Sequence, residues 1–96
     1  MLFAIIRNDR PNSLALRLSE RPKHLEYLAT VLDKIVYGGA LLDGYGKQNG
    51  SILIIDVTDR AAAATFADAD PYVDAGLFAS TIIQEFRHVF KDGAWL

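Results

Sequence analysis

Cysteine is the residue type that this chain of 96 residues lacks altogether. Without it the chain can form no disulfide framework, no thiolate nucleophile and no cysteine metal site, which fits a reducing cytoplasm, where we expect the protein. An excess of positive charge is also missing, because the formal net charge is −2. Proteins that bind nucleic acid usually have a basic balance, so the sequence predicts no nucleic-acid partner.

Long hydrophobic runs are absent as well. The opening run from Met1 to Ile6 is apolar and ends at Arg7. It is too short for a transmembrane helix and lacks the basic start of a signal peptide, so we expect no membrane partner. Hydrophobic residues nevertheless make up 51% of the chain. For one small domain this fraction is high, and it indicates that a partner covers part of the apolar surface.

The hydrophobic pattern predicts strands over residues 2–6, 36–42, 51–57 and 77–90. The first and third of these segments are apolar on both faces, which is typical of the central strands of a sheet. Residues 91–96, with the only Trp, are expected to form a tail that follows a single domain over residues 1–90.

Two main helices are expected between the strands. Ser19 is the predicted N-cap of the first, after a short helical piece over residues 14–18, with Pro22 in its first turn. The second helix is predicted over residues 60–69, with Asp59 as its cap. The expected buried stripe of the first helix consists of Leu25, Leu28, Ala29, Leu32 and Ile35.

The resulting order, β-α-β-β-α-β, is that of the α+β, ferredoxin-like split βαβ motif. It predicts a four-stranded antiparallel sheet with both helices on one face. The other face then needs a cover, and a second copy of the chain is the simplest one. We therefore expect a homodimer that forms through the sheet face.

His24 and Asp70 are the candidates for acid–base chemistry. His24 is either a helix residue beside the apolar stripe or a general base or acid, because imidazole titrates near neutral pH. Asp70 is a candidate N-cap of a short helical turn that begins at Pro71 and a candidate for the carboxylate that orients His24, two roles that compete for the same oxygens but do not exclude each other. We expect the two main helices to run parallel, which would separate these residues unless the 71–75 turn or a dimer contact brings them together.

Cationic side chains surround His24 in the sequence. Arg17, Arg21 and Lys23 are either solvated surface residues or groups that hold an anion. A ligand could also contact Ser19, although capping is its first interpretation, and Tyr72 and Tyr45, although aromatic residues beside helix ends more often only pack.

The remaining chemical groups give little indication of a cofactor. His88 lies in the last predicted strand without an acidic or His partner at ligand spacing, so we interpret it as structural. No pattern of residues resembles a strong metal motif, and Gly38-Gly39 lacks the spacing of a phosphate loop. We expect neither a metal nor another cofactor.

Three segments together resemble the YciI-like (YCII-related) family: residues 17–25 with Arg-Pro-Lys-His, residues 38–42 after the helix, and residues 66–76 with Asp-Pro-Tyr. The resemblance covers residues 1 to about 90. It implies a subunit similar to those of the dimeric α/β-barrel proteins and a proposed His–Asp active site, here His24 and Asp70. The family often has Gly-Pro where this chain has Gly39-Ala40.

The resemblance extends to a related dehydrochlorinase that acts on chlorinated hydroxyhydroquinones, which implies that the scaffold supports ring chemistry. The leading hypothesis is a small enzyme of lyase or isomerase type that moves a proton on a small anionic or phenolic ligand. His24 would shuttle the proton, Asp70 would orient it, and Arg17 or Arg21 would hold an oxygen anion. A non-catalytic binding or regulatory module is the alternative, and a structural partner domain is a third.

Overall fold

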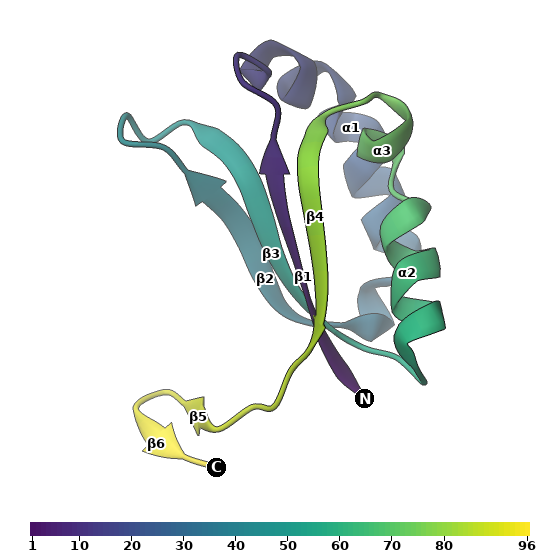
Figure 1. Ribbon diagram of the computed structural model, residues 1–96, viewed down its shortest axis with the longest axis vertical. Coiled ribbons are helices and arrows are strands. Elements are labelled where there is room, and N and C mark those ends of the chain that lie inside the picture. The colour runs from purple at the N-terminus through teal and green to yellow at the C-terminus, as the bar shows by residue number, and fades with distance from the viewer.

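A computed structural model describes all residues, 1–96, and has the predicted α+β architecture (Figure 1). Four strands form one antiparallel sheet in the order β2-β3-β1-β4. Their bounds are β1 Leu2–Asp9, β2 Ile35–Leu42, β3 Gln48–Asp56 and β4 Phe78–Glu85. The two strands that the sequence pattern marks as doubly apolar, β1 and β3, do lie in the centre.

The helices cover one face of the sheet (Figure 1). They are α1 Leu14–Thr30, α2 Arg60–Asp68 and the short α3 Pro71–Asp74, and a 3₁₀ turn, η1 Leu32–Lys34, follows α1. Asp59 caps α2 as predicted, because its side chain accepts a hydrogen bond from the Ala62 N–H at 2.8 Å. Asp70 caps α3 by accepting from the Tyr72 N–H at 2.9 Å.

The predicted start of α1 is wrong. The helix begins at Leu14, five residues before the predicted cap Ser19, and runs without interruption through Pro22. Ser19 does not cap it, because its hydroxyl donates back to the Leu16 carbonyl at 2.9 Å. A serine in this bond and a proline that only removes one N–H can both lie inside a helix, at some cost in stability. His24 therefore lies in the middle of α1 and not near its start.

The expected parallel arrangement of the helices is also wrong. In Figure 1, α1 descends from the end of the molecule where β1 finishes, whereas α2 rises toward that same end. Each helix follows a central strand, and because β1 and β3 pair antiparallel, the helices run in opposite directions. The end of α2 consequently lies toward the start of α1, and the short α3 that follows it is in contact with α1.

The core lies between the central strands and α2. It consists of Phe3, Ile5, Ile55, Val57, Ala63, Phe66 and Ala67, all buried. Alanines on α2 let this helix approach the sheet closely. The apolar stripe of α1 is less buried than predicted, since Leu25 is 44% and Leu32 63% exposed. These side chains line a cavity between α1 and the sheet instead of filling the core.

The last predicted strand is too long. β4 ends at Glu85, and the last backbone bond on that edge runs from the Phe86 N–H to the Leu2 carbonyl at 2.9 Å. Because β1 begins at Leu2, the chain beyond has no strand left to pair with. It instead forms a small hairpin of β5 Phe90–Lys91 and β6 Ala94–Trp95, which stands away from the sheet (Figure 1).

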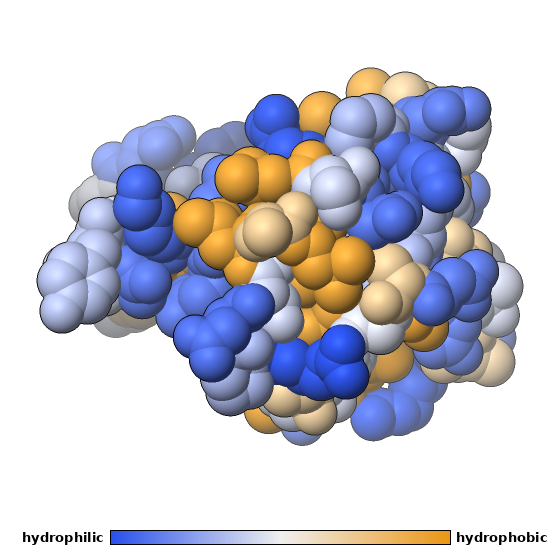
Figure 2. Space-filling model, turned by 90° about the horizontal axis from the view of Figure 1, so that it is seen from above, coloured by the Kyte–Doolittle hydropathy of each residue, from blue (hydrophilic) through white to orange (hydrophobic).

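The sheet face opposite the helices is covered within the chain only where residues 86–92 pass Val36, Tyr37 and Ile54. Tyr37, Ile52 and Ile82 on three of its strands are 77%, 37% and 51% exposed. Figure 2 shows a different surface, the upper end of the molecule in Figure 1, where hydrophobic side chains gather in the middle with hydrophilic ones around them. None of the helices has the length and apolar character needed to cross a membrane.

Candidate functional site

The candidate site is a cavity of about 370 Å³ between α1 and the inner face of β2 and β3. Apolar side chains of α1 form one wall, including Leu25 and Leu28. Charged and polar groups meet at the side where α1, β1 and α3 converge: Arg7, Arg17, Arg21, His24, Asp70 and Tyr72. Among the residues that the sequence suggested for ligand contact, Ser19, Lys23 and Tyr45 are absent from this lining.

His24 and Asp70 are in direct contact within one chain. The Nδ1 atom of His24 lies 3.0 Å from Oδ1 and 2.9 Å from Oδ2 of Asp70. Both side chains are largely buried, with 16% and 7% of their surface exposed. With Nδ1 turned to the carboxylate, the Nε2 atom is the nitrogen left for a molecule in the cavity.

Asp70 reaches His24 because it is the N-cap of α3. The short helix starts immediately after α2, and its cap residue has extended backbone with φ −65° and ψ 126°. Oδ1 accepts the Tyr72 N–H, while Oδ2 faces His24 and, at 3.8 Å, the Arg7 NH1 atom. Capping and contact with the imidazole, which the sequence left as competing interpretations, therefore occur together.

Tyr72 holds the imidazole from the side. Its ring stacks on His24 with centroids 4.2 Å apart and an angle of 16° between the planes. Its hydroxyl is occupied, since it donates to the Arg17 carbonyl at 3.2 Å, and the residue is only 1% exposed. Burial raises the pKa of Tyr72, with Asp70 adding to the rise and Arg17 opposing it. The side chain is placed to orient His24.

Arg17 and Arg21 differ in whether their guanidinium groups are available to bind a ligand. Arg17 donates from Nε and NH2 to the two carboxylate oxygens of Asp9 at 2.7 and 2.9 Å, and it is 4% exposed. Burial acts to lower the pKa of Arg17, but the hydrogen bonds and charge of Asp9 outweigh this and raise it. Arg21 is exposed at the cavity and forms no ion pair, so it is the cation available to a ligand.

The other residues considered from the sequence lie outside the cavity. Lys23 forms a surface ion pair with Glu20 at 3.7 Å. Ser19 is exposed on α1, and Tyr45 is 90% exposed in the β2–β3 turn. Ser19 is thus not placed to contact a molecule in the cavity, and neither is Tyr45.

Arg7 is a site residue that the sequence interpretation missed, because a charge after an apolar run was taken only as the end of a strand. It shares the inner face of β1 with Ile5 and Phe3, two and four positions earlier, and this alternation could have identified it. Its NH2 atom donates to the Ala67 carbonyl at 2.7 Å, and its guanidinium lies 4.4 Å from the centre of the Phe78 ring.

Polar groups on the far side of the cavity were missed as well. Gln48 and Ser51 of β3 line it across from α1, and Gly38 lines it on β2. A Cβ atom on Gly38 would meet the Leu53 side chain and lie 2.6 Å from the Ile52 carbonyl oxygen, so glycine allows the two strands to approach here. The sequence did contain an indication of these site residues, because polar residues stand at the start of the otherwise apolar strand β3.

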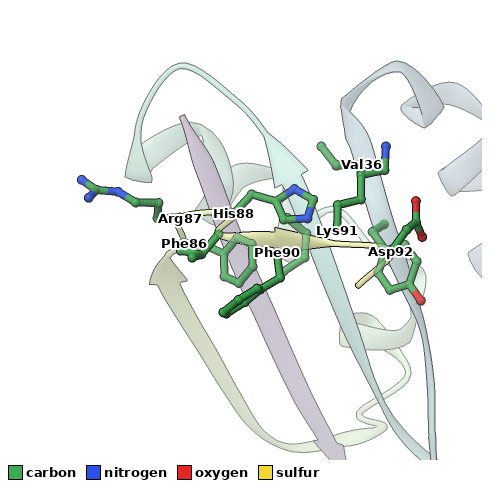
Figure 3. A pocket seen from close by; sticks show the side chains of 10 residues that line it. Val36, Phe86, Arg87, His88, Phe90, Lys91 and Asp92 are labelled. Carbon is green, nitrogen blue, oxygen red and sulfur yellow. The ribbon is translucent and has the colours of Figure 1, made fainter. Parts of the chain in front are cut away.

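A second cavity, of about 510 Å³, lies on the opposite side of the sheet (Figure 3). It is formed where residues 86–92 pass Val36, Tyr37 and Ile54. His88 points into this region, but it has no carboxylate partner, and its ring is 6.1 Å from that of Phe86. No group of three His, Asp or Glu residues that could hold a metal occurs in the chain.

Comparisons with known proteins give a consistent result. The model of the YCII-related domain family matches residues 1–87. Protein YciI of Escherichia coli is 36% identical, and an uncharacterized Haemophilus influenzae protein is 33% identical, over 94% of this chain and 100% of each relative.

Among solved structures, this chain is similar to the 5-chloro-2-hydroxyhydroquinone dehydrochlorinase TftG from Burkholderia phenoliruptrix, solved in complex with 2,5-dihydroxybenzoquinone. The TM-score is 0.87 and the identity 38%, over 92% of this chain and 95% of the other.

Proposed function

The chain belongs to the YCII-related domain family, and on that premise we propose that it is a small enzyme of lyase or isomerase type that uses His24 and Asp70 to move a proton. The observation that supports this most is the 2.9 Å contact between His24 Nδ1 and Asp70 Oδ2 beside a cavity. A carboxylate at Nδ1 orients the ring and stabilises the imidazolium that forms when Nε2 accepts a proton.

The cavity is suited to a small, partly apolar anion. Its volume of about 370 Å³ lies near the lower end of the range for ligand pockets, roughly 300–1,000 Å³. Apolar side chains line most of it, and Arg21 offers a positive charge at its edge. A phenol or enol that becomes an anion when it loses its proton meets both requirements, and the similar dehydrochlorinase acts on such a ring.

The proposed reaction begins when Nε2 of His24 removes an acidic proton from the ligand. The electron pair of the broken bond then makes an enolate or phenolate, whose oxygen Arg21 stabilises by charge. In an isomerisation the proton returns at another carbon, and in an elimination the electron pair expels a leaving group such as chloride. His24 ends each cycle neutral after it releases the proton to product or water.

The test uses His24→Ala and Asp70→Asn with chlorinated and unchlorinated hydroxyhydroquinones, and chloride release and ring absorbance are followed. His24→Ala should abolish turnover. Asp70→Asn should keep the cap, because Asn caps helices about as well as Asp, but should lower kcat on the order of a hundredfold or more. Asp59→Asn is the matched control, since Asp59 caps α2 away from the cavity.

A binding or regulatory module predicts a different result. His24→Ala would then weaken ligand affinity in a calorimetric titration, although the wild-type protein turns nothing over. If Asp70→Asn and Asp59→Asn are equally active, the carboxylate serves only as a cap and the catalytic proposal is wrong.

A further inference from the structure

Arg7 is a buried cation that the proposed reaction does not use directly. Its side chain is 5% exposed, and its Nε atom is buried without any hydrogen-bond partner. A buried charge is costly, so its neighbours matter. They are the Ala67 carbonyl near the end of α2, the Phe78 ring and the carboxylate of Asp70.

The position of Arg7 relative to Asp70 is unusual for an ion pair. The NH1–Oδ2 distance of 3.8 Å is within reach of the charge but too long for a hydrogen bond. The short contacts of Asp70 go to the Tyr72 N–H and to His24. Arg7 thus contributes its charge to the pair without taking a carboxylate oxygen away from the imidazole.

We infer that Arg7 is a positioning residue that keeps His24 in its neutral, proton-accepting form by balancing the charge of Asp70. With His24 neutral, the buried set of Arg7, Asp70 and His24 has no net charge. With His24 protonated, the set is one charge positive. If Arg7 were neutral, Asp70 and the imidazolium would form a balanced pair, and His24 would hold its proton more tightly.

The other charges around His24 do not replace this effect. They lie on β1, α1 and α2 and are Asp9, Arg17, Arg21 and Asp68, while the lining residues of β2 and β3 are uncharged. The charges of Arg17 and Asp9 cancel in their two hydrogen bonds. Arg21 and Asp68 are exposed, where water screens them.

The inference rests on the proposed role of His24 as a base, but its test measures the imidazole and needs no substrate. The chain has two histidines, so the NMR titration of His24 can be compared with that of His88 in the same sample. Arg7→Met removes the charge and keeps much of the volume, Arg7→Gln can still donate to Ala67, and Arg7→Lys restores the charge. Arg87→Met removes an exposed charge as the matched control.

The neutral variants should raise the midpoint of the His24 titration by on the order of one pH unit, while Arg7→Lys should stay within a few tenths of wild type. His88 should not move in these variants, and Arg87→Met should leave His24 unchanged. An unmoved or lowered midpoint in a folded neutral variant overturns the inference. So does unfolding of both neutral variants, since Arg7 would then serve the fold.

The two proposals can fail separately. A raised midpoint in Arg7→Met together with full activity of His24→Ala would leave the role of Arg7 intact and refute the catalytic one. An unmoved midpoint together with an inactive His24→Ala would do the reverse.

Discussion

At the scale of single residues, the aromatic side chain of Tyr72 links His24 to Arg17. Tyr72 stacks on His24 and donates its hydroxyl to the Arg17 carbonyl. Arg17 in turn lies with its guanidinium 5.0 Å from the centre of the Tyr72 ring and is fixed by Asp9. The orientation of the imidazole therefore depends on residues that a ligand need not touch.

Tyr72→Phe should reveal how this buried phenol responds to alkali. Burial raises the pKa of Tyr72 above its usual value near 10, so the folded protein holds the proton more tightly than the unfolded chain does. Stability should consequently fall as the pH rises past about 10. Tyr27, whose pKa is also raised by burial, contributes in the same direction.

At neutral pH the Tyr72→Phe variant lacks the hydrogen bond from the Tyr72 hydroxyl to the Arg17 carbonyl, so it should be about 1 kcal/mol less stable than wild type. The deficit should shrink as the pH increases, because phenylalanine has no proton to lose. Urea unfolding at pH 7 and at pH 10.5 measures both values. Parallel losses in the two proteins would show that the pKa of Tyr72 is the same in the folded protein as in the unfolded chain.

At the scale of elements, the caps of α2 and α3 allow a direct comparison. Asp59→Ala removes an exposed cap and should cost about 0.5–2 kcal/mol. Asp70→Ala removes a cap and also leaves Arg7 buried without its counter-charge, so it should cost more, roughly 3–5 kcal/mol. Chemical unfolding of both variants tests this, and equal losses would mean that the charge of Asp70 does not stabilise the fold.

The sequence was sufficient to predict the fold class and the two central strands, and it named His24 and Asp70, whose side chains lie in contact. Doubly apolar segments identify β1 and β3 as central, and a carboxylate before Pro71 identifies a cap. The start of α1 could not be predicted in the same way, because Ser19 and Pro22 are common at helix starts and also fit inside a helix that packing holds together. The contact itself depends on helix direction, which follows from the pairing of β1 with β3.

Arg7 illustrates the limit for a single side chain. A charge at the end of an apolar run is usually solvated, and the sequence offers no sign that α2 ends beside it. Only the packing of α2 against β1 places the Ala67 carbonyl and Asp70 around the guanidinium. Alternation along β1 can place Arg7 on the inner face of the sheet, but the partners of the buried charge are defined by tertiary structure, so local pattern cannot identify them.

At the scale of the whole molecule, the surface is larger than a compact monomer needs. The accessible area is 6314 Å², against about 5,500 Å² expected for a folded chain of this mass. The excess accompanies an apolar sheet face that the chain covers only in part and a hairpin with Trp95 77% exposed. Such a surface on a small domain is typical of an interface, and we propose that a second copy covers it.

Sedimentation of the purified protein at micromolar concentration should therefore show about twice the chain mass. Ile52→Lys places a charge at the middle of the sheet face, on the central strand β3, where a dimer would bury it without a partner. The dissociation constant of the Ile52→Lys dimer should be on the order of a hundredfold or more above that of wild type, which corresponds to about 3 kcal/mol. Leu18→Lys, on the exposed side of α1, is the matched control and should leave the dimer unchanged. A wild-type monomer whose sheet remains folded would disprove the dimer, and equal weakening by both lysines would place the interface elsewhere.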